Sequence, residues 1–222
     1  MKRRRESEMR SVIRSAIEEI SLAAKIKSQD DDDHVALNIP TKPLLSACHL
    51  IIQLLDKIGP TMAVLRRDLH QNIQRIEKLY ETDPTVYSTL VEILKKEVNE
   101  GSARKGNSCS KAILWLTRSM DFTVALLQIL VKDPEKNMEQ AVEESYNITL
   151  KPWHGWISAA AYKVALKLVP DNEEFINLLM AKDESYETLK EEIQTLTSLL
   201  VPYLEGIHAN LRSYGLDRLK ST

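Results

Sequence analysis

Three polar residues in the stretch VLRRDLHQNIQRIEKLY have the spacing of one helical face. Asp68, Asn72 and Arg75 lie at offsets of zero, four and seven residues, so on an α-helix their side chains project from the same side. A carboxylate accepts hydrogen bonds, an amide both donates and accepts them, and a guanidinium donates several. The spacing therefore predicts one binding face for a neutral polar group that carries several hydroxyls.

Two later stretches supply aromatic and imidazole side chains that could complete this face. ILWLTRSMDF carries Trp115 and Arg118, and KPWHGWISAA carries His154 between Trp153 and Trp156. No Ser or Cys lies in an elbow-like nucleophile motif, and no HExxH-type spacing of metal ligands occurs. These residues indicate binding rather than catalysis, and we expect neither a cofactor nor a metal.

Composition favours a helical domain. At 222 residues the chain can bury a large core in one domain. Hydrophobic residues make up 43% of it, Gly and Pro are few, and Val and Ile recur at helical intervals rather than in alternation. The formal net charge of -2 gives no global attraction to nucleic acid. We expect an all-α protein that does not bind nucleic acid.

Residues 1–40 are predicted to form an N-terminal extension. A basic start at Lys2–Arg5 precedes an amphipathic helix over residues 8–27. The acidic run at residues 29–34 then leads to Pro40 as a mobile connection, because like charges repel. This run lacks the glycine and terminal glutamate of a calcium loop, so we expect no metal there. The basic start is interpreted as a solvated tail, with attachment to an anionic membrane or nuclear import as alternatives.

Cysteine usage and the N-terminus indicate the cytosol. The chain has two cysteines, Cys48 and Cys109, no CxxC motif and no apolar signal region, so we expect free thiols in a reducing compartment. No segment approaches the roughly 20 apolar residues of a membrane span. Even LLSACHLIIQLL is interrupted by Ser46, His49 and Gln53.

From Thr41 onward, capping and breaking residues divide the chain into helices, and we assign residues 41–222 to one domain. The expected helices span 41–57, 61–81, 84–99 and 108–132, one begins at Asp133-Pro134, and others lie near 152–168, 172–181 and 184–214. Pro202 is expected to kink the last of them. Seven or eight helices in one domain exclude a simple four-helix bundle.

Residues 41–216 resemble the glycolipid transfer protein family, in its plant-type form. The resemblance rests on TKPLLSACHLIIQLLDKIGP, the helix that carries Asp68, ILWLTRSMDF, and KPWHGW followed by ALKLVP, in the family's order and at its approximate spacings. It implies an all-α sandwich of two helical layers, with about eight helices, that encloses the chains of a lipid. It also implies a monomeric, non-enzymatic carrier that moves sphingolipids between membranes through transient contact with their surfaces.

The resemblance also assigns roles to the polar residues. Asp68 would bond sugar hydroxyls and the ceramide amide N–H, and Asn72 would hold the same sugar. Trp115 would stack on the sugar ring, and His154 would bond the ceramide amide carbonyl. Arg75 stands where animal glycolipid carriers have lysine, which changes a point donor into a planar fork.

A second branch of the superfamily carries ceramide 1-phosphate. In that branch a cationic residue replaces Asn72 and an arginine replaces Trp115, and this sequence has neither replacement. A glycosylceramide is therefore favoured, although a phosphate ligand stays open because several arginines lie nearby. These are Arg66, Arg67, Arg75 and Arg118. Two further alternatives are an enzyme that uses Asp68 and His154 as acid and base, and a sensor or interaction protein of the same fold that lacks transfer activity.

The lipid chains would need an apolar sleeve, because exposing each CH₂ to water costs about 0.8 kcal/mol. Candidates for its lining are Leu44, Leu45, Ile52, Leu55, Val64, Phe122, Val124, Leu126, Ile129, Ala159, Val164 and Leu168. Ordinary core packing is the alternative for each. Trp156 and Trp153 are candidates for membrane docking, because indole favours the interface between water and hydrocarbon. For Trp156 the alternative is a core aromatic.

Overall fold

The computed structural model describes residues 11–27 and 38–221, and in these residues the regular structure is helical. The predicted basic start at Lys2–Arg5 and the acidic run at residues 29–34 lie outside the described residues. The elements are α2 (Val12–Lys27), α3 (Thr41–Ile58), η1 (Pro60–Met62), α4 (Ala63–Thr82), η2 (Val86–Ser88), α5 (Leu90–Asn99), α6 (Cys109–Lys132), α7 (Met138–Thr149), α8 (Trp156–Leu166), α9 (Asn172–Leu179) and α10 (Tyr186–Ser213).

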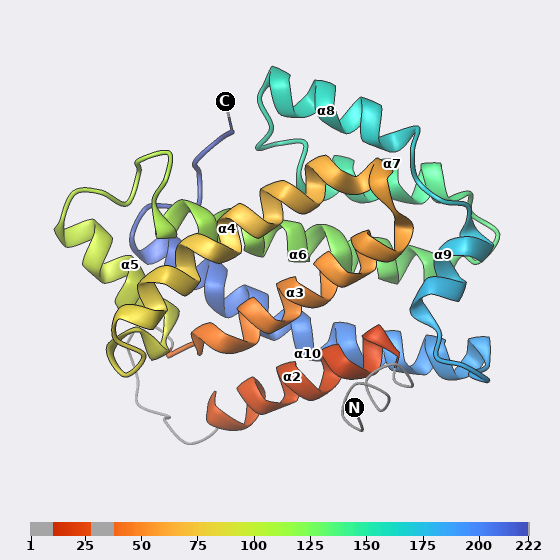
Figure 1. Ribbon diagram of the computed structural model, residues 1–222, viewed down its shortest axis with the longest axis horizontal. Helices are drawn as coiled ribbons and strands as arrows, with labels where there is room; N and C mark the ends of the chain where they lie inside the picture. Colours follow the sequence, from red (N-terminus) through yellow and green to blue (C-terminus); the bar gives the residue numbers. More distant parts are fainter. Residues whose placement is uncertain (1–10, 28–37, 222) are drawn as a thin grey trace.

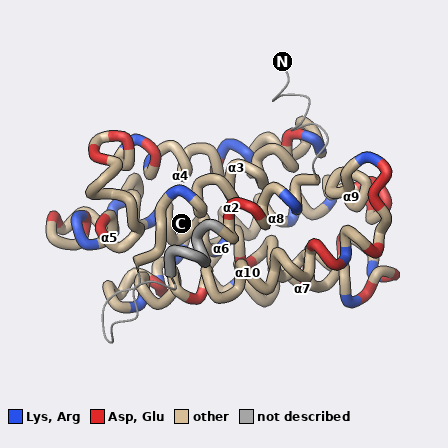
Figure 2. Tube along the Cα trace, turned by 90° about the horizontal axis from the view of Figure 1, so that it is seen from below, with Lys and Arg blue, Asp and Glu red and all other residues tan. Residues whose placement is uncertain are grey.

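The helices form two packed layers, as the family resemblance implied. Helices α3 and α4 lie in one layer and α6, α7 and α10 in the other, which Figure 2 shows nearly edge-on. Helix α6 is central, because it packs against α4, α7 and α10. Aliphatic side chains fill the space between the layers, including the fully buried Leu44, Ile73, Ile113, Leu116 and Ile207. The core thus fixes α4 against α6, the two helices that carry the predicted site.

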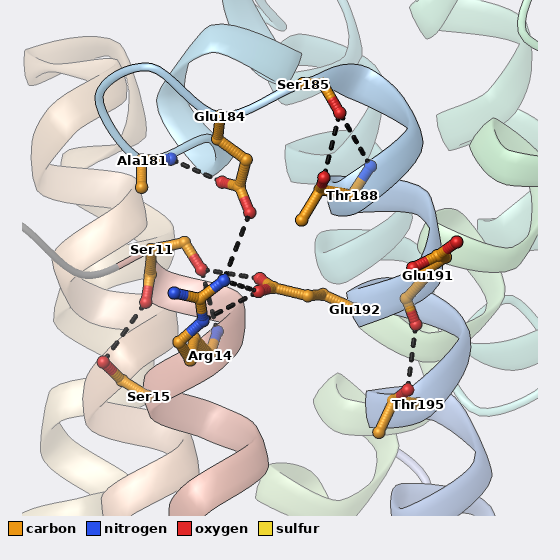
Figure 3. A network of polar contacts seen from close by, with 10 residues as sticks. All are labelled: Ser11, Arg14, Ser15, Ala181, Glu184, Ser185, Thr188, Glu191, Glu192 and Thr195. Carbon is orange, nitrogen blue, oxygen red and sulfur yellow. Dashed lines mark hydrogen bonds and ion pairs between the residues drawn. The ribbon is translucent and has the colours of Figure 1, made fainter.

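Helix α2, from the predicted extension, packs against α3 and α10 and buries Ile20 in the shared core. A polar network ties it to α10 (Figure 3). The guanidinium of Arg14 and the hydroxyl of Ser11 both bond the carboxylate of Glu192, at 2.8 Å from Arg14 Nε and 2.9 Å from Ser11 Oγ. Arg14 also lies 3.9 Å from Glu184. The domain boundary at residue 40 stays a prediction, but the core includes residues on both sides of it.

The single helix predicted over residues 84–99 is wrong. The chain forms a short turn at η2, becomes extended at Thr89 and re-enters a helix at Leu90. This break occurs because Thr89 pairs with Pro40 in an isolated bridge, and the Leu90 amide donates to the carbonyl of Ile39 at 2.9 Å. Tertiary pairing with a distant segment overrides the local helical signal here.

The helix predicted to begin at Asp133-Pro134 starts later. Asp133 has φ -136° and ψ 81°, outside the helical region, and its carbonyl accepts from the Lys136 amide at 3.1 Å to close a turn. Helix α7 then begins at Met138, where the side chain of Asn137 accepts from the Glu139 amide at 2.8 Å. The cap that forms, at Asn137, therefore marks the start of the helix.

Among the described helices, α6 is long and apolar enough by length and composition to span a membrane, contrary to the expectation that no segment would be. However, 61% of its most apolar 18-residue window is buried inside the fold. Its apolar faces contact α4, α7 and α10 rather than lipid. Helix α6 is therefore the core helix of the sandwich.

Candidate functional site

Helix α4 presents Asp68, Asn72 and Arg75 on one face, where they contact each other. The Asn72 amide donates to the Asp68 backbone carbonyl at 3.1 Å and lies 3.4 Å from the Asp68 carboxylate. The Arg75 guanidinium donates to the Asn72 side-chain oxygen at 3.1 Å. Asn72 is only 5% exposed, whereas Asp68 is exposed. The acid is thus the accessible member of a connected set.

The environment of Asp68 suits a carboxylate that accepts hydrogen bonds from a ligand. Its outer edge meets solvent, but neighbouring protein atoms displace part of its water, and this desolvation raises the pKa of the carboxyl. The positive charge of Arg75 opposes the shift and keeps the ionised form. A carboxylate that has lost part of its hydration is stabilised when ligand hydroxyls donate hydrogen bonds to it.

Packing of α4 on α6 brings Trp115 to the level of Asp68. The thiol of Cys109, on α6, donates to the backbone carbonyl of Arg75, on α4, at 3.3 Å. Both cysteines are free thiols, as expected. The two helices run in opposite directions (Figure 1). Asp68 lies about two turns before Arg75, and Trp115 about two turns after Cys109, so the two residues share one level of the layer interface.

A ladder of aromatic rings extends the site from α6 to α8. The ring centres of Trp115 and His154 lie 5.7 Å apart, and those of His154 and Tyr146 lie 5.4 Å apart. Tyr146 in turn stacks on Tyr162 with centres 3.5 Å apart and planes 4° from parallel. Both tyrosines lie outside the motifs that pointed to the site, and only the packing of α8 on α7 brings Tyr162 onto Tyr146.

His154 is a neutral imidazole with an unused nitrogen. Burial lowers its pKa, and the positive charge of Arg118 lowers it further, so the ring is uncharged at neutral pH. Its backbone amide donates to the Leu150 carbonyl at 3.1 Å, which fixes the turn that carries it. Within the described part of the chain, the buried Nδ1 atom has no hydrogen-bond partner. A buried polar atom without a partner is costly, so this nitrogen is available to a ligand.

Arg118 has a structural role in the site that its place in ILWLTRSMDF did not indicate. Its side chain is 2% exposed, and the guanidinium lies 4.1 Å from the ring centre of Trp153 and 4.8 Å from that of Trp115. Nη1 donates to the Leu219 carbonyl and Nη2 to the Asp217 carbonyl, both at 2.7 Å. Desolvation lowers its pKa to about 10, so it stays charged at neutral pH. Arg118 therefore joins two indoles to the C-terminal segment.

The C-terminal segment also caps α8. The Ser221 amide donates to the Trp153 carbonyl at 2.9 Å, and the Ser221 hydroxyl accepts from the Gly155 amide at 2.9 Å. The Ser158 hydroxyl lies 2.9 Å from the same oxygen. Gly155 has no side chain with which to cap the helix, so a residue from the far end of the chain supplies the acceptor. No sequence motif pointed to this segment.

Comparison with known proteins identifies the family of this chain. A model of the glycolipid transfer protein (GLTP) family matches residues 39–181. The chain belongs to this family. Glycolipid transfer protein 3 of Arabidopsis thaliana is 60% identical, and the match covers 94% of this chain and 91% of that protein. Glycolipid transfer protein 2 of the same plant is 56% identical over 100% of both chains.

A solved GLTP-fold structure that concerns how FAPP2 selects simple glycosphingolipids superposes with a TM-score of 0.75. It is 29% identical to this chain, and the match covers 86% of this chain and 93% of that one. The comparisons confirm the resemblance on which the sequence analysis relied, and with it the GLTP fold. The two layers, and α6 at their centre, are therefore the family's architecture.

Helix α8 of this GLTP-family protein carries an exposed apolar surface. Trp156 is 80% exposed, Val164 63% and Ile157 51%, and no α8 residue is buried. Trp153, by contrast, is partly buried against Arg118. The two indoles that the sequence analysis grouped as docking residues thus occupy different environments, and Trp156 is the one that faces solvent.

The residues predicted to line a lipid sleeve fall into three groups. Leu44, Leu45, Val124 and Leu126 are buried, and Ile52, Leu55, Phe122, Ile129 and Ala159 are partly buried. Val64, Val164 and Leu168 lie on the surface, so they could contribute only at an open edge of a sleeve. Val124 also lines a hollow of about 160 Å³ between α6 and α10. The aliphatic core occupies the interlayer space, so bound lipid chains would have to part the layers. The lining stays a prediction.

Proposed function

We propose that this protein carries glycosylceramides between membranes without catalysing a reaction. The observation that carries the proposal is the unpaired Nδ1 of His154, beside Trp115 and at the level of the Asp68 face. A neutral donor or acceptor, an indole face and a carboxylate are the groups that an amide and its sugar require. The family and the names of its relatives support this class of ligand.

The head group would be held from two sides. Asp68 accepts hydroxyl donors, and Asn72, oriented by its bonds to Asp68 and Arg75, adds a donor and an acceptor. The indole of Trp115 offers a flat apolar face to a sugar ring. His154 reaches the ceramide amide, where its neutral ring can either donate or accept a hydrogen bond. Binding thus uses hydrogen bonds and ring stacking that are lost when the lipid leaves, and no covalent bond is made or broken.

Ceramide 1-phosphate is the weaker alternative, because most nearby arginines already have partners. Arg118 bonds two backbone carbonyls and lies against two indoles. Arg66 pairs with Asp56, and Arg75 donates to Asn72. A phosphate would compete with these contacts for the guanidinium groups, whereas a neutral sugar needs no charge partner.

Membrane contact would occur through α8. Its exposed Trp156, Ile157 and Val164 would enter the headgroup region, since indole and aliphatic side chains favour that interface. The protein would work as a monomer in the cytosol, because a second subunit on this surface would block docking. Loading would then be nearly neutral in free energy, because the acyl chains move from one apolar environment to another.

The test is transfer of fluorescent glucosylceramide, galactosylceramide, lactosylceramide and ceramide 1-phosphate between vesicles, by the wild type and by Asp68→Val. We expect transfer of the glycosylated lipids, lost in the variant while the circular dichroism spectrum stays helical. Preference for ceramide 1-phosphate would overturn the head-group assignment. No transfer of any lipid would overturn the carrier function and favour a sensor or interaction protein with the same fold.

A further inference from the structure

Two tyrosine hydroxyls beside the candidate site lack partners. The hydroxyl oxygens of Tyr146 and Tyr162 are buried, and neither makes a hydrogen bond within the described part of the chain. Tyr146 is 4% exposed and lies on α7, next to His154, whereas Tyr162 comes from α8 and stacks on it. The unpaired Nδ1 of His154 belongs to the same group of rings. Three buried polar atoms without partners thus gather at one end of the aromatic ladder.

Such a group needs an explanation, because buried tyrosine hydroxyls usually find partners. A phenylalanine at either position would provide the same ring stacking without a polar atom to satisfy. Stacking alone therefore accounts for the rings and leaves the hydroxyls unexplained. Desolvation raises the pKa of both phenols, that of Tyr162 to about 12, so both are neutral at physiological pH and can donate as well as accept.

The place of the tyrosines limits what they could contact. The Tyr146 ring centre lies 5.4 Å from that of His154, the residue proposed to bond the ceramide amide. Lipid atoms one or two carbons from that amide would therefore lie near the Tyr146 ring, on which Tyr162 stacks. At this position sphingolipids differ in whether the acyl chain carries a hydroxyl on the carbon next to the carbonyl. A neutral hydroxyl matches a neutral phenol, since each can donate to the other.

We propose that Tyr146 and Tyr162 select sphingolipids that carry a 2-hydroxyl on the acyl chain. This inference rests on the proposed transfer function and adds a specificity that the head-group residues do not supply. A hydroxylated lipid would give the phenols hydrogen-bond partners that a plain acyl chain cannot give. The site discriminates because loading the plain lipid leaves the same polar atoms buried and unpaired.

The experiment compares two galactosylceramides of equal chain length, with and without the 2-hydroxyl, as competitors for transfer of a fluorescent glycosylceramide. For the wild type we expect the hydroxylated lipid to compete about 2- to 10-fold better, the ratio that one net hydrogen bond provides. In Tyr146→Phe and Tyr162→Phe the ratio should fall toward one, because the hydroxylated lipid loses its hydrogen-bond partners. Tyr186→Phe, at the start of α10 and outside the aromatic ladder, is the matched control and should keep the wild-type ratio.

The outcomes separate this inference from the carrier function. Equal competition by the two lipids in the wild type would overturn the selection of hydroxyls and leave transfer intact. A preference that survives in the double Tyr→Phe variant would assign the hydroxyl to another residue and also overturn the proposal. If neither lipid competes and no lipid is transferred, the proposed function fails, and the inference fails with it.

Discussion

The guanidinium of Arg118 lies 4.1 Å from the ring centre of Trp153, close enough for a cation–π contact. Arg118 belongs to the central helix α6, and Trp153 belongs to the turn that leads into α8. The same guanidinium holds two carbonyls of the C-terminal segment. The Arg118 side chain therefore fixes helix α6, the turn that carries Trp153 and His154, and the C-terminal segment relative to each other.

Arg118→Lys tests this linkage. Lysine keeps the charge but lacks the planar fork, so it cannot hold the Leu219 and Asp217 carbonyls together while it stacks on Trp153. We expect a loss of about 1–3 kcal/mol in the free energy of unfolding, measured by urea denaturation. Arg212→Lys, an exposed change near the end of α10, is the control and should have little effect. Equal stability of the two variants would contradict the assigned role.

Ser221→Ala removes the acceptor that caps α8. The Gly155 amide loses its partner, so the first turn of α8 should open more often. Hydrogen exchange at residues 155–158 should accelerate several-fold, with global stability reduced by about 1 kcal/mol or less. Ser213→Ala, also near the C-terminus, should leave this exchange unchanged. Unaltered protection in Ser221→Ala would show that the cap is dispensable.

Asp68→Asn separates binding from stability. Because the pKa of Asp68 is raised on folding, the unfolded state ionises more easily, and stability falls as the pH rises through the folded pKa. The asparagine variant lacks this pH-dependent loss of stability, so at pH 7 its melting temperature should equal or slightly exceed that of the wild type. Glycosylceramide transfer should fall at least about 10-fold, because an amide accepts fewer hydroxyl donors. Glu81→Gln on the same helix is the control. A destabilised Asp68→Asn would instead give the acid a structural role.

Trp156→Ala tests membrane docking. The indole is 80% exposed, so its removal should not affect folding, but vesicle binding should weaken about 10-fold. Co-sedimentation with neutral vesicles measures this directly. Val86→Ala removes an exposed apolar side chain far from α8 in the sequence and should bind as the wild type does. Unchanged binding of Trp156→Ala would refute docking through this residue.

His154 gives the fold an acid-side pH dependence. Its folded pKa is lowered, so as the pH falls below about 6.5 the unfolded state takes up the proton more readily and stability decreases. In His154→Gln the decrease in melting temperature between pH 7.5 and 5.5 should be smaller than in the wild type. His70→Gln, at an exposed position on α4, should retain the wild-type decrease. Parallel curves for all three proteins would show that His154 does not titrate differently on folding.

Local signals in the sequence were sufficient to predict most helices and the helical face that Asp68 shares with Asn72 and Arg75. The cap at Ser108 and the break at Gly59 placed α6 and α3 within a residue of their observed bounds. With the zero, four and seven spacing, Asn72 lies within hydrogen-bonding distance of both Asp68 and Arg75. These features depend on residues close together in the chain, where helical geometry alone decides which side chains meet.

Long-range packing could not be predicted in the same way. The helix over 84–99 fails because Thr89 pairs with Pro40, and nothing local encodes that pairing. Arg118 was noted within ILWLTRSMDF and as a nearby charge, but its burial against the C-terminal carbonyls depends on residues about 100 positions away. Tyr162 likewise meets Tyr146 only after α8 packs on α7.

The bond between Arg14 and Glu192 joins residues 178 positions apart, near opposite ends of the chain. A chain still emerging from the ribosome holds α2 and α3 long before α10 exists, so the part of α2 that α10 covers stays exposed for most of synthesis. Contacts between residues so far apart in the sequence slow folding, and the hydrophobic surface that stays exposed meanwhile can bind other chains. We therefore expect the nascent protein to need shielding of its first helix until the last one is made.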